Sequence, residues 1–179
     1  MHDWNVVVTV HEGGFREAFR LLAEFGPVSK TEFFNTLVMR VEEIPQTLEN
    51  LRARSLGEPD SVRFLGRFMP VSQTFGFQSP AEFEARTRAI VSAWVEELVG
   101  RSFHVRMHRR GFKGRLSSMD EERFLDDFLL HLLAEAGSPG RVTFAEPDII
   151  IAAETVGTRG GLSLWRRAEV VRYPFLRLD

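Results

Sequence analysis

A short basic segment in the middle of the chain has the residue types best suited to bind a polyanion. Residues 101–115, RSFHVRMHRRGFKGR, contain six Arg or Lys side chains and two histidines but no acidic residue. Guanidinium groups form bidentate hydrogen bonds with phosphate, and an exposed aromatic ring can stack on an unpaired base. The segment therefore predicts a nucleic-acid surface, although an arginine-rich solvated face would give the same pattern.

Most of the candidate RNA contacts lie in the later part of this segment. Two more, near the end of the chain, are chosen from their charge alone. The cations suit phosphate, Phe112 is a weaker candidate for stacking on a base, and Gly111 and Gly114 would let a backbone approach closely. The predicted contacts are Arg106, His108, Arg109, Arg110, Phe112, Lys113 and Arg115, extended by Arg166 and Arg167.

The overall charge neither requires nor excludes such a surface. The formal net charge is −2, but the local field around a concentrated basic patch governs encounter with a polyanion more than net charge does. The same arginine cluster could meet an acidic protein partner, so a protein-interaction domain stays open as an alternative.

Motifs for common enzyme chemistry are missing from the sequence. The chain has no cysteine, which excludes disulfides, thiolate nucleophiles and cysteine-based zinc sites. It contains no GxxxxGK phosphate loop, no GxGxxG dinucleotide loop and no GxSxG nucleophile elbow. His104 and His108 are four residues apart, but on a strand Arg106 lies between them and its charge opposes a metal cation. We therefore expect no catalytic residue, metal or cofactor, with a small RNA-modifying enzyme as the alternative.

Other polar residues have structural explanations. Glu121 and Glu122 suit the positive end of a helix dipole, and Asp126 suits a solvated helix face. Asp148 is expected in a turn or a cap. His131 falls within an apolar helix pattern and is expected at the core or its boundary.

The basic segment is predicted to begin as a strand at Ser102–His108. Apolar residues alternate there with His and Arg, which places the two kinds on opposite faces. The face expected in the core carries Phe103, Val105 and Met107. The opposite, wetter face carries His104, Arg106 and His108.

The first part of the chain reads as β-α-β-α-β and predicts a small ferredoxin-like unit. The expected strands are Trp4–Val10, Phe34–Val41 and a segment within Val62–Phe75, with helices beginning near Phe15 and Pro45. A boundary is expected near Gly76–Ser79, which divides the chain into domains 1–75 and 76–179.

The second part predicts a further α/β domain around the basic strand. Two capping boxes begin its helices, Ser79-Pro80-Ala81-Glu82 and Ser118-Met119-Asp120-Glu121. Further strands are expected at Val142–Phe144, Ile149–Thr155 and Leu162–Trp165.

This second part resembles the THUMP domain over about residues 76–165. The resemblance rests on Phe103-His104-Val105-Arg106 followed by His108-Arg109-Arg110-Gly111, a long amphipathic helix, and Pro147-Asp148 before Ile149–Glu154. The preceding unit resembles the ferredoxin-like domain that accompanies THUMP in many RNA-modification proteins. The implied fold is α+β, an N-terminal ferredoxin-like unit followed by a THUMP-like α/β domain.

The resemblance implies RNA binding, usually at the acceptor end of tRNA. Many members are fused to a methyltransferase, a thiouridine synthase or a deaminase, and this sequence shows no motif of these enzymes. It is similar to the short stand-alone members, which implies a non-catalytic adaptor that presents tRNA to a separate modifying enzyme, with a tRNA cytidine acetyltransferase as the leading partner. No apolar run approaches the roughly 20 residues of a membrane span and no secretory signal is seen, so we expect no membrane association and a cytoplasmic location.

Overall fold

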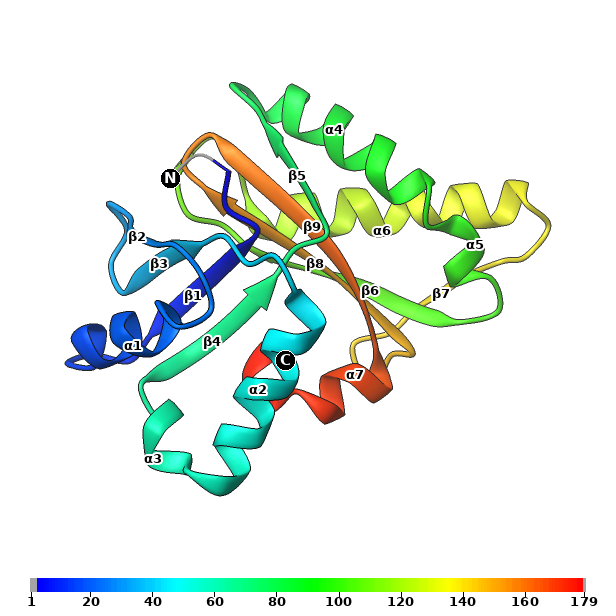
Figure 1. The fold of residues 1–179 in the computed structure, drawn as a ribbon. Coiled ribbons are helices and arrows are strands. Elements are labelled where there is room, and N and C mark those ends of the chain that lie inside the picture. The colour runs from blue at the N-terminus through cyan, green and yellow to red at the C-terminus, as the bar shows by residue number, and fades with distance from the viewer. Residues whose placement is uncertain (1–2, 179) are drawn as a thin grey trace. The chain divides into compact units, whose positions relative to one another are not determined.

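The computed structural model describes residues 3–178, which divide into two compact units. The first unit contains the chain up to Val71 together with Val170–Arg177, and the second contains Ser72–Glu169 with Leu178. Both units combine a β-sheet with helices (Figure 1). The predicted α+β fold class is confirmed.

The first unit is built on a four-stranded antiparallel sheet. Its elements are β1 (Val6–Val10), α1 (Phe15–Leu22), β2 (Val28–Lys30), β3 (Thr36–Met39), α2 (Ile44–Gly57), α3 (Pro59–Val62) and β4 (Leu65–Pro70). The strand order is β2-β3-β1-β4. Because α2 and α3 follow each other directly, the chain reads β-α-β-β-α-β, which is the ferredoxin-like order.

The sequence prediction missed one strand of this sheet. β2 has only three residues and follows the Gly26-Pro27 turn signal, so its length gave no periodic pattern to detect. It pairs antiparallel with β3, Val28 opposite Met39. The three predicted strands correspond to β1, β3 and β4.

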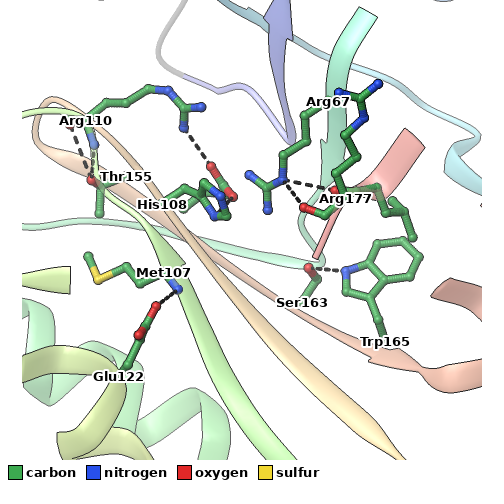
Figure 2. A network of polar contacts seen from close by, with 11 residues as sticks. Arg67, Met107, His108, Arg110, Glu122, Thr155, Ser163, Trp165 and Arg177 are labelled. Atoms are coloured by element: carbon green, nitrogen blue, oxygen red, sulfur yellow. Dashed lines mark hydrogen bonds and ion pairs between the residues drawn. The ribbon is translucent and has the colours of Figure 1, made fainter. Parts of the chain in front are cut away.

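The C-terminal segment belongs with the first unit, whereas the expected domain 76–179 placed it in the second. α7 (Arg167–Arg172) leads into a 3-10 turn, η1 (Pro174–Leu176), which packs against β4. Arg67 of β4 donates from Nε to the carbonyl oxygens of Leu176 and Arg177 at 3.0 and 3.2 Å (Figure 2). Such contacts between distant parts of the chain leave no signal in the local sequence.

The second unit is built on a five-stranded mixed sheet. Its elements are β5 (Gln73–Gly76), α4 (Pro80–Ser92), α5 (Val95–Leu98), β6 (Ser102–His108), α6 (Ser118–Glu135), β7 (Arg141–Val142), β8 (Ile149–Val156) and β9 (Arg159–Arg166). The strand order is β5-β9-β8-β6-β7, with β6 parallel to both neighbours and β9 antiparallel to β8 and β5. β5 begins at Gln73, so this unit begins before residue 76, where the sequence predicted its first residue.

Two helices, α4 and α6, lie against one face of this sheet (Figure 1). Between them and the strands is an apolar core in which Phe77, Phe83, Phe103, Leu125 and Leu129 are buried. Burial of such side chains stabilises a fold by about 1.5–3 kcal/mol each. This core fixes α6 beside β6, the strand that carries the basic row.

The helix starts follow the predicted capping chemistry with one shift in register. Ser79 accepts a hydrogen bond from the Glu82 amide, as the capping box predicts, whereas the Glu82 carboxylate accepts from the amide of Gln78, one residue before the cap. For α6 the cap is Ser117, whose Oγ accepts from the Asp120 amide at 3.3 Å. The prediction of Ser118 as the cap was wrong by one residue, since either serine fits the local pattern.

The side chain of His131 on α6 is 70% exposed, so the expectation of a core or boundary histidine was wrong. Its Nε2 lies 3.4 Å from Glu135, one turn later on the solvent side.

Within residues 3–178, none of the helices has both the length and the apolar character needed to cross a membrane.

Candidate nucleic-acid surface

β6 places its two sets of alternating side chains on opposite faces, as predicted. Phe103, Val105 and Met107 are at most 5% exposed and belong to the apolar core. On the other face, Arg106 and His108 are half-buried. The basic row therefore exists, but it is less open to solvent than the alternation alone suggested.

His104 departs from the prediction of a wet face, because it is buried. Its Nδ1 lies 3.0 Å from the carbonyl oxygen of Thr143, and its ring is 5.2 Å from the ring of Phe144. Burial lowers the pKa of this imidazole, and the charge of Arg106 acts in the same direction. A buried ring with a lowered pKa is a poor phosphate ligand, so His104 does not join the basic surface.

The loop after β6 is attached to β8 at its first residues. The Arg110 amide donates to both the carbonyl oxygen and the hydroxyl of Thr155, at 3.1 and 3.0 Å (Figure 2). The Gly157 amide in turn donates to the Arg110 carbonyl at 2.9 Å. These bonds continue the β6–β8 ladder past the end of β6 and fix where the basic loop, residues 109–115, leaves the sheet.

A fully buried carboxylate on β8 lies beside Arg110 and His108 at this point. Glu154 is 0% exposed and stands opposite His108 in the strand register. Its Oε2 lies 2.8 Å from Nη1 of Arg110, and its Oε1 lies 3.7 Å from Nδ1 of His108. A buried carboxylate is stable only when it is paired and hydrogen-bonded, and the guanidinium of Arg110 provides such a bond.

This role of Glu154 was not predicted from the sequence. The residue had been included in the apolar run Ile149–Thr155 that predicted a buried strand. A single acid within such a run was the available signal, because burying it is costly unless a cation lies beside it. The register that brings His108 and Arg110 to it is a property of the tertiary fold.

The glycine at the start of the basic loop serves the chain's own packing. Gly111 has a φ of +100°, and a Cβ there would lie 3.1 Å from Cα of Gly157. Gly114 has a φ of +76° with open space around it. The close approach expected of a ligand at Gly111 is thus made by the hairpin between β8 and β9.

The remaining loop residues separate into packed and exposed side chains. Arg109 is half-buried and donates from Nη1 to the Gly111 carbonyl. The ring of Phe112 lies 4.8 Å from that of Phe77, so its packing against the core competes with stacking on a base. Lys113 and Arg115 are exposed, and the Arg115 guanidinium lies 4.9 Å from the Phe112 ring centre.

One cation near this loop had not been predicted. Arg159 stands opposite Val156 where β8 and β9 meet, next to the Gly157 backbone that contacts Gly111. Its Nη2 donates to Thr74 Oγ1 at 2.6 Å. This bond directs its guanidinium to β5, and the pairing with β5 and β8 places its backbone close to the turn at Gly157.

Arg166 and Arg167 are not brought together with the basic loop. Arg166 pairs in register with Ile149 at the start of β8, whereas the loop is attached at Thr155 near its end. At about 3.3 Å per residue, the step from Ile149 to Glu154 alone covers roughly 17 Å. Arg166 is paired with Glu97, and Arg167 donates from Nε to the Pro147 carbonyl at 3.1 Å.

Asp148 has the structural role expected of a turn or cap. Its Oδ2 accepts from the amide and the hydroxyl of Ser102 at 2.9 and 2.8 Å, which ties the start of β8 to the start of β6. The hydrogen bonds from Ser102 lower the pKa of this carboxyl.

As for metals, no group of three His, Cys, Asp or Glu side chains suited to hold an ion occurs in residues 3–178.

No protein-family model and no curated protein matches this sequence. Similar solved structures include PH1313 from Pyrococcus horikoshii Ot3, with a TM-score of 0.56 and 14% identity over 90% of this chain and 54% of that one. TrmN from Thermus thermophilus matches with a TM-score of 0.58 and 16% identity over 89% of this chain and 44% of that one. A 4-thiouridine synthetase, in complex with RNA and with bound ATP, matches with a TM-score of 0.53 and 17% identity. The match covers 90% of this chain and 40% of that one.

These likenesses concern the fold. This chain spans about half or less of the length of the structures that it matches. They agree with the THUMP-like α/β fold that the sequence resemblance implied.

Proposed function

We propose that this chain binds tRNA through the basic loop 109–115 and presents it to a separate modifying enzyme, without catalysing the modification. The observation that carries the proposal is the attachment of the loop to β8 through Glu154 and Thr155, which places Lys113 and Arg115 at an exposed site. A rigid base reduces the conformational entropy lost on binding. The likeness to a synthetase in complex with RNA supports the same assignment.

The division of the cations suggests two roles. Arg110 and His108 contact the buried Glu154, and we assign them to holding the loop in place. Lys113 and Arg115 are exposed, and we assign them to phosphate. Phosphate contacts fix position on a folded RNA without reading its sequence, which suits an adaptor.

The binding test uses a charge-reversal variant at the exposed cations. Lys113→Glu with Arg115→Glu should weaken tRNA binding at least tenfold and reduce the salt slope of log affinity by about 1 per lost contact. Arg110 is avoided, because Arg110→Glu would place a second carboxylate beside Glu154 and destabilise the fold. The matched control is Arg166→Glu with Arg167→Glu, the same charge change at the far end of β8, which should bind nearly as wild type.

The adaptor role needs a separate measurement. Removing the single-stranded acceptor end of tRNA should reduce binding, and deleting the gene should abolish one tRNA modification while its enzyme is still present. Cytidine acetylation is the first modification to examine, because the resemblance to stand-alone THUMP proteins points to that partner. Docking on one tRNA raises the effective concentration of the enzyme at its target base.

Two outcomes would contradict this proposal. An intact modification profile in the deletion strain would remove the adaptor role even if RNA binding were observed. A new modified nucleoside made by the purified chain alone, detected by mass spectrometry of digested tRNA, would make the chain an enzyme.

A further inference from the structure

The outer edge of β6 is only partly covered by another strand. β7 pairs with β6 at Ser102 and Phe103 and ends there. Beyond this point two carboxylates from α6 take the place of a strand. Asp126 Oδ1 accepts from the Val105 amide at 2.9 Å, and Glu122 Oε1 accepts from the Met107 amide at 2.6 Å (Figure 2 shows the Met107–Glu122 bond).

A groove runs along α6, between this helix and the segment that contains Val142 of β7 and Phe144, and it has an apolar wall. Its volume is about 410 Å³, and its lining includes Met119, Leu130, Val142 and Phe144. Met119 and Phe144 are 67% and 69% exposed, which is unusual for large apolar side chains.

Phe144 is held in this exposed position by its neighbours. The Thr143 amide donates to the Phe103 carbonyl at 3.0 Å, and the Thr143 hydroxyl donates to the Ala145 carbonyl at 3.2 Å. The buried ring of His104 lies against Phe144 from the sheet side. The apolar wall is therefore a built feature of the fold.

The rest of the groove is acidic. Glu122, Asp126 and Asp127 line it, with Arg123 as the cation among the lining residues. Asp126 is buried, contrary to the solvated helix face expected from the sequence, and burial raises the pKa of its carboxyl to about 7, so Glu122 and Asp127 carry most of the negative charge. Carboxylates repel phosphate, so the groove does not suit RNA, in contrast to the basic loop at the end of the same strand.

We infer that this groove binds an extended segment of a protein partner in which basic and apolar side chains alternate. The groove follows α6 from Met119 to Leu130, a helical rise of roughly 17 Å, which matches a short extended peptide. Alternation would direct its apolar side chains to Phe144 and Met119 and its cations to Asp127 and Glu122. The inference does not require RNA binding, so its failure would leave the proposed function untouched.

The test uses a short fluorescein-labelled peptide in which arginine and leucine alternate. A second peptide with glutamate in place of arginine is the comparison. The arginine peptide should bind at least tenfold more tightly, and its addition should shift the amide resonances of Val105 and Met107 in the NMR spectrum of the full chain. Equal binding of the two peptides would overturn the inference.

Three variants locate the binding on the protein. Asp127→Lys should weaken the arginine peptide about fivefold, since it reverses one charge contact, and Phe144→Ser should weaken it about tenfold or more by removing apolar contact. Glu135→Lys, the same charge change on α6 outside the groove, should stay within about twofold. All three side chains are exposed, so the variants should fold.

Two results would contradict the location or the class of partner. Unchanged affinity in both Asp127→Lys and Phe144→Ser would place the peptide elsewhere. A single-stranded oligonucleotide that shifts the same two amides and displaces the peptide would assign the groove to nucleic acid.

Discussion

The carboxylate of Glu154 lies 2.8 Å from Nη1 of Arg110, and the Glu154 side chain is completely buried. This pair joins the last part of β8 to the first residues of the basic loop. Arg110 is only 15% exposed along its side chain, and this carboxylate compensates its charge. Arg110, one of the cations in the basic loop, therefore helps to hold the fold together.

We predict that Glu154→Gln destabilises the protein strongly. The substitution keeps the shape but leaves the Arg110 charge partly buried without its carboxylate, and breaking such a pair costs about 3 kcal/mol. Urea unfolding followed by circular dichroism measures this free energy. Glu135→Gln, on the exposed side of α6, is the control and should change it by less than about 0.5 kcal/mol. A Glu154→Gln variant as stable as wild type would show that the pair contributes little.

Alanine substitution should separate the two glycines of the basic loop. Gly111→Ala adds a Cβ 3.1 Å from the Gly157 backbone at a positive φ, so strain and crowding act together. Gly114→Ala meets open space and should cost only the conformational strain, about 1 kcal/mol. Thermal unfolding should therefore rank wild type above Gly114→Ala and Gly114→Ala above Gly111→Ala. The reverse order of the variants would mean that Gly111 does not pack against Gly157 in solution.

The stability of the fold should depend on the protonation of Glu121. Burial raises the pKa of this carboxyl to about 7, and the charges of Glu84 and Asp120 add to the effect. The folded state therefore holds the proton more tightly than the unfolded chain does. Its contribution is complete below about pH 4.5 and is lost as the pH rises through about 7.

The corresponding variant is Glu121→Gln, which cannot ionise. Relative to wild type, it should gain on the order of 2 kcal/mol of unfolding free energy between about pH 4.5 and about pH 8. Denaturant unfolding at several pH values measures this difference. A constant difference across that range would contradict the raised pKa.

We predict that Phe112→Leu lowers stability more than it lowers RNA affinity. The ring packs against Phe77, so its loss should cost about 1 kcal/mol through packing and ring–ring contact. Fluorescence titration with tRNA should show a change of less than about threefold. A larger loss, at unchanged unfolding temperature, would return Phe112 to the RNA surface as a stacking residue.

Local pattern in the sequence determined several features correctly. The alternation in Ser102–His108 placed Phe103, Val105 and Met107 in the core, because a strand directs successive side chains to opposite faces whatever surrounds it. The cap at Ser79 and the basic character of the loop beyond His108 also follow from neighbouring residues alone.

Other features were decided only by contacts between distant segments. Phe144 packs against the buried ring of His104, the β6–β8 register pairs Arg110 with Glu154, and the length of β8 separates Arg166 from the basic loop. The free energy of each arrangement depends on which segment packs against a side chain or which residue lies opposite a charge. That partner lies tens of residues away in the chain, so it is set by strand order and register and leaves no periodic signal in the sequence.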